Sequence, residues 1–176
     1  EILVRLRDGE VTIRPLAGTL PEDFPYQRVL HIPVDREAMT CKVPVGPGIT
    51  LPLSPFFGVM GVAPPPAFET ITSIAPRIHG GNLDNKELQA GSTLFLPVHV
   101  PGANFSVGDG HGVQGDGEVC VSALEMCLTG TFTFRLHKAT GQAMPRAETP
   151  THYISIGINE DLDQAMKQAV REMIAF

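Results

Sequence analysis

Acidic and imidazole side chains gather in one glycine-rich stretch of the chain, NFSVGDGHGVQGDGEVCVSALE over residues 104–125. Its candidate ligands are Asp109, His111, Asp116, Glu118 and Glu125. The glycines that alternate with them permit backbone conformations, including φ > 0, in which short side chains converge on one point. Carboxylates and imidazoles are typical ligands of zinc, and carboxylates alone suit calcium. The stretch therefore predicts a divalent-metal site or a site for a small polar substrate.

The residues of this stretch also fit two other interpretations. GHGVQG, residues 110–115, fits the pattern G-x-G-x-x-G, but a dinucleotide fold requires a helix to follow it. Here Asp116, Gly117 and a strand-like EVCVSALEM follow, so this interpretation fails. His111 could also be an exposed turn histidine, and a metal-binding or acid/base role is favoured by its acidic neighbours.

Glu125 lies inside an apolar run, and residues 118–128 are expected to form a strand. In a strand Glu125 shares a face with Val119, Val121 and Ala123. A carboxylate buried in this way needs a cation, a metal or a hydrogen-bond donor, or its pKa rises until it is neutral. Both outcomes suit a catalytic carboxylate. The alternative is a purely structural role for Glu125, in an ion pair with an arginine such as Arg135.

A second polar segment, HGGNLD over residues 79–84, supplies two further candidates. Asp84 can act as a ligand or simply cap the residues that follow. The remaining histidines are expected to be structural, and among them His79 is the next candidate for a functional role. Cys120 or Cys127 could be a nucleophile beside Lys86, although free cysteines in strands are usually small core residues. The pattern G-x-S-x-G of a serine hydrolase is absent.

Composition predicts one mainly β domain over residues 1–176. Only 18% of the 176 residues are charged, and 34 are glycine or proline. The net charge of −6 and the scattered basic residues exclude nucleic-acid binding, and no apolar run is long enough to span a membrane. Three cysteines without a CxxC motif, and no signal peptide, favour a cytoplasmic protein. The absence of an initial methionine suggests a fragment of a longer chain.

Periodicity places short strands along most of the chain and a helix at its end. A hairpin is expected around Asp8 and Gly9, from strands at 2–7 and 11–16. Prolines between residues 41 and 76 allow only short strands and loops, and further strands are expected at 93–100, 118–128 and 131–137. The region 159–175 predicts an amphipathic α-helix with acids in its first turn, and Met166 and Met173 are expected in the core. The predicted fold is an antiparallel β-sandwich with a C-terminal helix.

The string TSIAPRIHGGNLDNKELQAGSTLFLPVHVPGANFSVGDGHGVQGDGEVCVSALE resembles the acetamidase/formamidase family. PLSPFFGVMGVAP before it and ISIGINEDLDQAMKQAVREMI after it are also similar to that family. Ala103 and Asn104 depart from it, since the family more often has Ala-Leu there, and the chain is shorter than a full member. The resemblance implies a jelly-roll-like β-sandwich with an α/β annex, in a homo-oligomeric cytoplasmic enzyme that hydrolyses short aliphatic amides.

The resemblance also implies a set of site residues. Asn82 and Asp84 match in GGNLD, Asp109 and His111 in GDGH, and Gln114, Asp116 and Glu118 in QGDGE, with Glu125 closing the segment. We expect Asp84, Asp109 and His111 to bind metal, Glu125, Asp116 and Glu118 to act in catalysis, and Asn82 and Gln114 to bind substrate.

The resulting hypothesis is metal-assisted hydrolysis of formamide or acetamide. A divalent cation, zinc with calcium as the alternative, activates water, and Glu125 carries its proton to the departing ammonia. The rival hypothesis is a non-enzymatic β-sandwich module in which the same acids hold a structural calcium ion.

Overall fold

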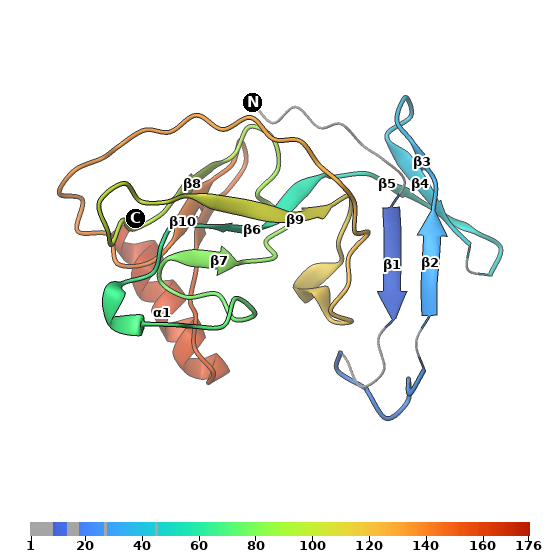
Figure 1. Cartoon of the computed structure of the whole chain (residues 1–176), viewed down its shortest axis with the longest axis horizontal. Helices are drawn as coiled ribbons and strands as arrows, with labels where there is room; N and C mark the ends of the chain where they lie inside the picture. The colour runs from blue at the N-terminus through green and yellow to red at the C-terminus, as the bar shows by residue number, and fades with distance from the viewer. Residues whose placement is uncertain (1–8, 14–17, 27, 45) are drawn as a thin grey trace. The chain divides into compact units, whose positions relative to one another are not determined.

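The computed structural model describes residues 9–13, 18–26, 28–44 and 46–176, with side chains described from residue 18 onward. The fold is mainly β with a C-terminal α-helix, as the sequence predicts (Figure 1). Its strands are β1 Gly9–Ile13, β2 Arg28–Ile32, β3 Val34–Asp35, β4 Thr40–Val43, β5 Ile49–Pro52, β6 Phe56–Gly61, β7 Gly80–Asn82, β8 Thr93–Phe95, β9 Ser106–His111, β10 Arg146–Glu148 and β11 Tyr153–Ser155. The helical elements are the 3₁₀ turns η1 Pro66–Phe68 and η2 Asp116–Glu118, and the helix α1 Leu162–Ala175.

The chain divides into two compact units. The first contains Glu1–Gly58, Asp84–Ala90 and Asp109–Phe132, and the second contains Val59–Leu83, Gly91–Gly108 and Thr133–Phe176. The strands form four sheets with the orders β1-β2, β3-β4-β5, β7-β6-β9 and β11-β10-β8. The single domain over residues 1–176 stays a prediction.

The first unit is built around a small apolar core. β1 pairs antiparallel with β2, and β4 with β5, where Cys41 faces Leu51 across the pair. The predicted hairpin around Asp8 and Gly9 falls mostly on residues outside the described part of the chain. The core consists of Ile32, Cys41, Leu53, Leu124 and Met126. It therefore joins strands from the start of the chain to the segment after β9.

Two glycines bring the end of β9 close to residues 124–126. Gly112 N–H donates to Leu124 O at 2.8 Å, and Met126 N–H donates to Gly110 O at 2.7 Å. A Cβ on Gly110 would overlap Met126 O, and one on Gly112 would lie 2.5 Å from Met126 Sδ. The side of β9 that faces residues 124–128 must therefore be bare. Asp109 and His111, the residues that alternate with these glycines, project elsewhere.

The expected strand over 118–128 is wrong. Residues 116–118 form η2, and Val121 N–H donates to Glu118 O at 2.7 Å, which closes a turn. Val119 and Val121 are more than half exposed, and Glu125 alone forms an isolated β-bridge, with His111. Apolar residues at alternating positions do not reveal a turn that a single backbone hydrogen bond closes.

Two further strand predictions need correction. Residues 131–137 form no strand, and the strand expected at 93–100 ends at Phe95. Pro97 follows closely and lacks the N–H that a continuing ladder needs. Between residues 41 and 76 the expected short strands are present as β4, β5 and β6.

Helix α1 belongs to the second unit and confirms the predicted C-terminal helix. It begins after Asp161, whose side chain accepts a hydrogen bond from Gln164 N–H. Ser155 Oγ donates to Ala169 O at 2.7 Å, and Arg146 forms an ion pair with Glu172 at 3.0 Å. Within the described residues, no helix has both the length and the apolar character that a membrane crossing requires.

The helix packs through small residues rather than through its methionines. A Cβ on Gly157 would overlap Ala165 O and lie 2.9 Å from Ala169 N, so the backbones are in close contact. Met166 and Met173 are 56% and 41% exposed. Their predicted place in the core is therefore wrong, because the face of α1 that contacts Gly157 carries alanines.

We expect Gly157→Ala to destabilise the protein. The added methyl group meets backbone atoms of α1, which cannot rotate away, so the cost should be about 1–3 kcal/mol, as for overpacked cores. Urea unfolding followed by far-UV circular dichroism measures the change. Gly108→Ala is the control, because a Cβ there meets nothing within 4 Å. Equal stability of the two variants would show that α1 does not pack against Gly157.

Candidate functional site

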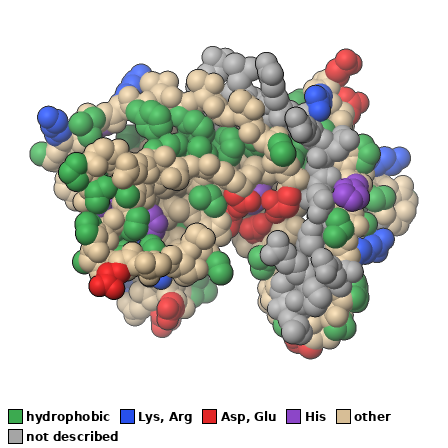
Figure 2. Space-filling view, viewed as in Figure 1, with side chains coloured by type: hydrophobic (Ala, Val, Ile, Leu, Met, Phe, Trp, Pro, Cys, Tyr) green, Lys and Arg blue, Asp and Glu red, His purple; other side chains and the backbone are tan. Residues whose placement is uncertain are grey.

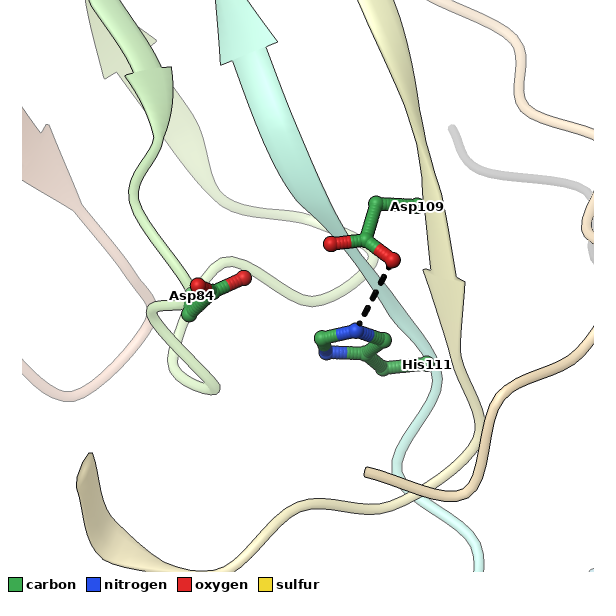
Figure 3. A group of neighbouring side chains, drawn as sticks. All are labelled: Asp84, Asp109 and His111. Atoms are coloured by element: carbon green, nitrogen blue, oxygen red, sulfur yellow. Dashed lines mark ion pairs between the residues drawn. The ribbon is translucent and has the colours of Figure 1, made fainter. Parts of the chain in front are cut away.

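Asp109 and His111 project from the end of β9 toward Asp84, which lies in the segment after β7 (Figure 3). Asp84 N–H donates to Gly58 O at 3.1 Å, so β6 holds this segment in place. One ligand-type atom from each of Asp84, Asp109 and His111 lies within 4.8 Å of the others. All three residues belong to the first unit.

The space between these three side chains depends on Gly58. A Cβ at this position would lie 2.5 Å from Asp84 Oδ1, 2.7 Å from Asp109 Oδ2 and 2.9 Å from His111 Cε1. The φ angle of Gly58 is outside the left-handed region, so the backbone conformation does not require glycine. Glycine is required here because any side chain would fill the centre of the site.

His111 is fully buried and surrounded by carboxylates. Its Nε2 lies 3.1 Å from Asp109 Oδ1, 3.3 Å from Glu125 Oε2 and 3.9 Å from Glu118 Oε1. None of these oxygens meets the geometry of a hydrogen bond, so Nε2 is a buried nitrogen without a hydrogen-bond partner. Asp84 Oδ1 is also buried without such a partner. Both atoms belong to the group of three that surrounds Gly58.

Gln114 fixes the orientation of the His111 ring. Its amide Nε2 donates to Asp84 O at 2.7 Å, so its Oε1 faces His111 Nδ1 at 2.9 Å. Nδ1 must therefore carry a hydrogen and donate it to Gln114. Proton exchange and metal binding are left to Nε2, the usual consequence of a partner that fixes a ligating histidine. The geometry favours this positioning role for Gln114, and its substrate-binding role stays a prediction.

The carboxylates control the protonation of His111. Burial opposes the charged imidazolium, but contact with Glu125 and the charges of Glu125, Asp109 and Glu118 outweigh it and raise the pKa of His111 to about 9. For Glu125, burial acts upward, yet His111 and the N–H of Ala123 lower its pKa below the usual value. His111 is thus the cation beside Glu125, the place that an arginine such as Arg135 would fill in the alternative interpretation.

Two further carboxyl groups have raised pKa values. Burial, followed by the negative charge of Asp84, raises the pKa of Glu118 to about 7. The pKa of Asp84 is raised by its burial and by the charge of Asp109. Glu118 therefore retains a proton in part near neutral pH, because it is buried in a cluster that holds more negative charge than His111 can balance.

Backbone strain accompanies the cluster. Asp84, Asp109 and Glu118 have φ angles of +43°, +59° and +45°. Such conformations are uncommon outside glycine and are often found at functional sites. Here they turn three acidic side chains toward His111.

Four candidate residues do not join this cluster. Asp116 is 89% exposed and forms an ion pair with Lys86 at 2.7 Å. Asn82 belongs to the second unit, where its amide donates to Ile74 O at 3.1 Å. Cys120 and Cys127 are exposed free thiols. The catalytic role of Asp116 and the substrate contact of Asn82 stay predictions.

Sequence reasoning did not identify Gly58 as part of the site. Its signal was a glycine inside the apolar strand FFGVMG, which often marks close approach by another group. The positioning role of Gln114 was not predicted either, because it depends on a hydrogen bond to the Asp84 carbonyl, which is distant in sequence.

The donor set suits a divalent metal ion. Two overlapping groups share His111, namely Asp84-Asp109-His111 and His111-Glu118-Glu125. Figure 2 shows acidic side chains gathered in one patch around a histidine. Imidazole together with carboxylates favours zinc or another transition metal over calcium, which prefers oxygen ligands. The two buried atoms without a hydrogen-bond partner and the space kept by Gly58 are consistent with an ion at this position.

Comparison with known proteins identifies the family. Residues 65–175, well over half of the chain, match the acetamidase/formamidase family. The chain belongs to this family. A formamidase of Methylophilus methylotrophus is 46% identical over 61 residues, which cover 34% of the chain and 15% of that protein. An acetamidase of Mycolicibacterium smegmatis is 49% identical over 55 residues, covering 31% of the chain and 14% of that protein.

A solved structure of a family member has the same fold. The crystal structure of an acetamidase from Bacillus halodurans is 35% identical, with a TM-score of 0.88. The alignment covers 98% of this chain and 57% of the acetamidase chain. The protein therefore spans little more than half the length of that relative.

We expect His111 to titrate with a pKa of about 9 in the metal-free protein. Glu125→Gln removes a negative charge beside Nε2, so it should lower this pKa toward the ordinary value of about 6.5. Imidazole ¹⁵N chemical shifts followed against pH measure both values, with exposed Glu37→Gln as the control. A His111 that titrates near 6.5 in all three proteins would contradict the described cluster.

Proposed function

We propose that this protein takes part in hydrolysis of the C–N bond of a short linear amide, giving a carboxylate and ammonia. The names of its relatives, formamidase and acetamidase, support this substrate class. The observation that carries the proposal is the meeting of Asp84, Asp109 and His111 around Gly58, with two buried ligand-type atoms that lack a hydrogen-bond partner. Homo-oligomer formation and a cytoplasmic location stay predictions.

We further propose that Asp84, Asp109 and His111 hold a divalent cation, zinc in the first instance. His111 offers Nε2 because Gln114 occupies Nδ1, and the two aspartates offer carboxylate oxygens. When bound, such an ion polarises a carbonyl oxygen and lowers the pKa of water. Because the pKa of His111 is raised to about 9, binding the ion at Nε2 displaces a proton from this ring near neutral pH.

Proton transfer is better assigned to Glu118 than to Glu125. A general base works best with a pKa near the working pH, and the pKa of Glu118 is about 7. Glu118 can accept a proton from the attacking water and return it to the departing nitrogen, so that ammonia leaves. Glu125 is occupied, because its Oε1 accepts from Ala123 N–H at 3.0 Å and its Oε2 faces His111. We therefore propose that Glu125 balances His111, whereas the sequence predicts it as the proton carrier.

The rival functions depend on different groups. A structural calcium site would leave no place for His111 among the ligands, because calcium takes oxygen donors. A thiol mechanism would use Cys120 or Cys127, which lie outside the residues that form the cluster. The described geometry therefore favours the metal-assisted amidase.

We expect the purified protein to release ammonia from formamide or acetamide, to lose this activity on chelation and to regain it with zinc. Gly58→Ala should weaken zinc binding and activity roughly 10- to 100-fold, the range for changes that disturb metal ligands. Gly115→Ala is the control, because a Cβ there meets nothing within 4 Å. An ammonia assay and a zinc titration measure the two effects.

Three outcomes separate the hypotheses. Release that survives chelation but stops on thiol alkylation would assign the chemistry to a cysteine. No release, together with calcium in the purified protein, would support the structural module. Unchanged zinc affinity in Gly58→Ala would place the metal elsewhere.

A further inference from the structure

A second group of buried nitrogens lies in the second unit. The described residues contain five buried side-chain nitrogen or oxygen atoms without a hydrogen-bond partner. Two are Asp84 Oδ1 and His111 Nε2, which belong to the candidate metal site. The other three are Arg77 Nε, His79 Nδ1 and His99 Nε2. Leaving a buried polar group unpaired is costly, so three in one unit require an explanation.

The backbone holds the segments that carry these three residues at the end of β6. Arg77 and Gly80 exchange two backbone hydrogen bonds of 3.0 Å, which close a tight turn around His79. Val62 N–H then donates to His79 O, and the next residue, Ala63, donates to Ala103 O in the loop that follows His99. Val62 and Ala63, which directly follow β6, therefore hold both the turn around His79 and the loop after His99 in place.

Close packing fixes the turn that carries His79. A Cβ on Gly61 would lie 2.7 Å from Gly81 N and 3.1 Å from His79 O. A Cβ on Gly80 would lie 2.6 Å from Met60 O. His79 therefore starts from a backbone position that β6 determines, rather than from a free loop.

The charges around His79 all have the same sign. Burial lowers its pKa, and the positive charges of His99 and Arg77 lower it further. Among the described residues, no carboxylate pairs with any of the three side chains. The cluster thus offers the guanidinium charge of Arg77 and three buried nitrogens that have no hydrogen-bond partner among the described residues.

We propose that Arg77, His79 and His99 form a binding site for a small oxyanion such as a carboxylate. Carboxylate oxygens accept hydrogen bonds from guanidinium and imidazole groups together, and the Arg77 guanidinium supplies the opposite charge. The oxyanion is either a free ion or the carboxylate of an Asp or Glu side chain from a second copy of this chain. The three residues that would bind the oxyanion are different from the residues of the candidate metal site.

Titration with sodium formate at constant ionic strength tests the site. We expect saturable shifts of the His79 and His99 imidazole signals, with sodium chloride as the reference salt. Arg77→Gln removes one charge-assisted donor and should weaken formate binding roughly tenfold. Arg171→Gln, an exposed arginine of α1, should leave the affinity unchanged. His99→Gln provides a second weakened variant if Arg77→Gln does not fold.

The oligomeric state of the full chain distinguishes the two sources. Light scattering that shows a wild-type dimer, which either added formate or the Arg77→Gln substitution dissociates, would identify a side-chain carboxylate as the ligand. A monomer with saturable formate shifts would identify a free ion. Shifts of equal size in Arg77→Gln, or no saturable shift together with a formate-insensitive oligomeric state, would overturn the proposal.

Discussion

The structure depends on an excess of negative charge around one buried imidazole. Four carboxyl groups, those of Asp84, Asp109, Glu118 and Glu125, interact with His111. One imidazolium cannot balance four carboxylates in a buried position, so the pKa values of His111, Glu118 and Asp84 rise to retain protons. A divalent cation would replace those protons with charge that does not depend on pH. This electrostatic demand links the fold to the proposed chemistry.

Glycines make that convergence possible. Gly110 and Gly112 let β9 approach residues 124–126, which places Glu125 beside His111. Gly58 keeps the centre of the site open, and it also accepts the hydrogen bond that holds Asp84. The glycine content of the chain therefore reflects close approach between backbones and side chains as much as turn formation.

Much of the site could be predicted from the sequence, because its residues are close along the chain. Asp109 and His111 alternate with glycines, and this pattern alone indicated that they act together. Asp84 is 25 residues before Asp109, and only the family resemblance favoured its role as a ligand over that of a cap. Glu125 was predicted from its place on the apolar face of an expected strand. That segment is instead a turn followed by a single bridge from Glu125 to His111. Tertiary hydrogen bonds decide such features, and local patterns do not contain them.

The buried face of helix α1 was also determined by a contact that the sequence pattern does not contain. Its boundaries followed from periodicity and from the acids of its first turn, but its buried face did not, because close contact with Gly157 selected alanines over the larger methionines. The positioning role of Gln114 was equally hidden, since it depends on the carbonyl of Asp84, thirty residues away in sequence. In both cases the decisive contact is with the backbone of another segment, which local patterns do not contain.

X-ray absorption of the zinc-loaded protein at the zinc K-edge tests the central claim most directly. If Asp84, Asp109 and His111 hold the ion, the first shell contains nitrogen and oxygen at about 2.0–2.1 Å, with imidazole scattering that disappears in His111→Ala. A sulfur shell at about 2.3 Å, or a spectrum that His111→Ala leaves unchanged, would contradict the account.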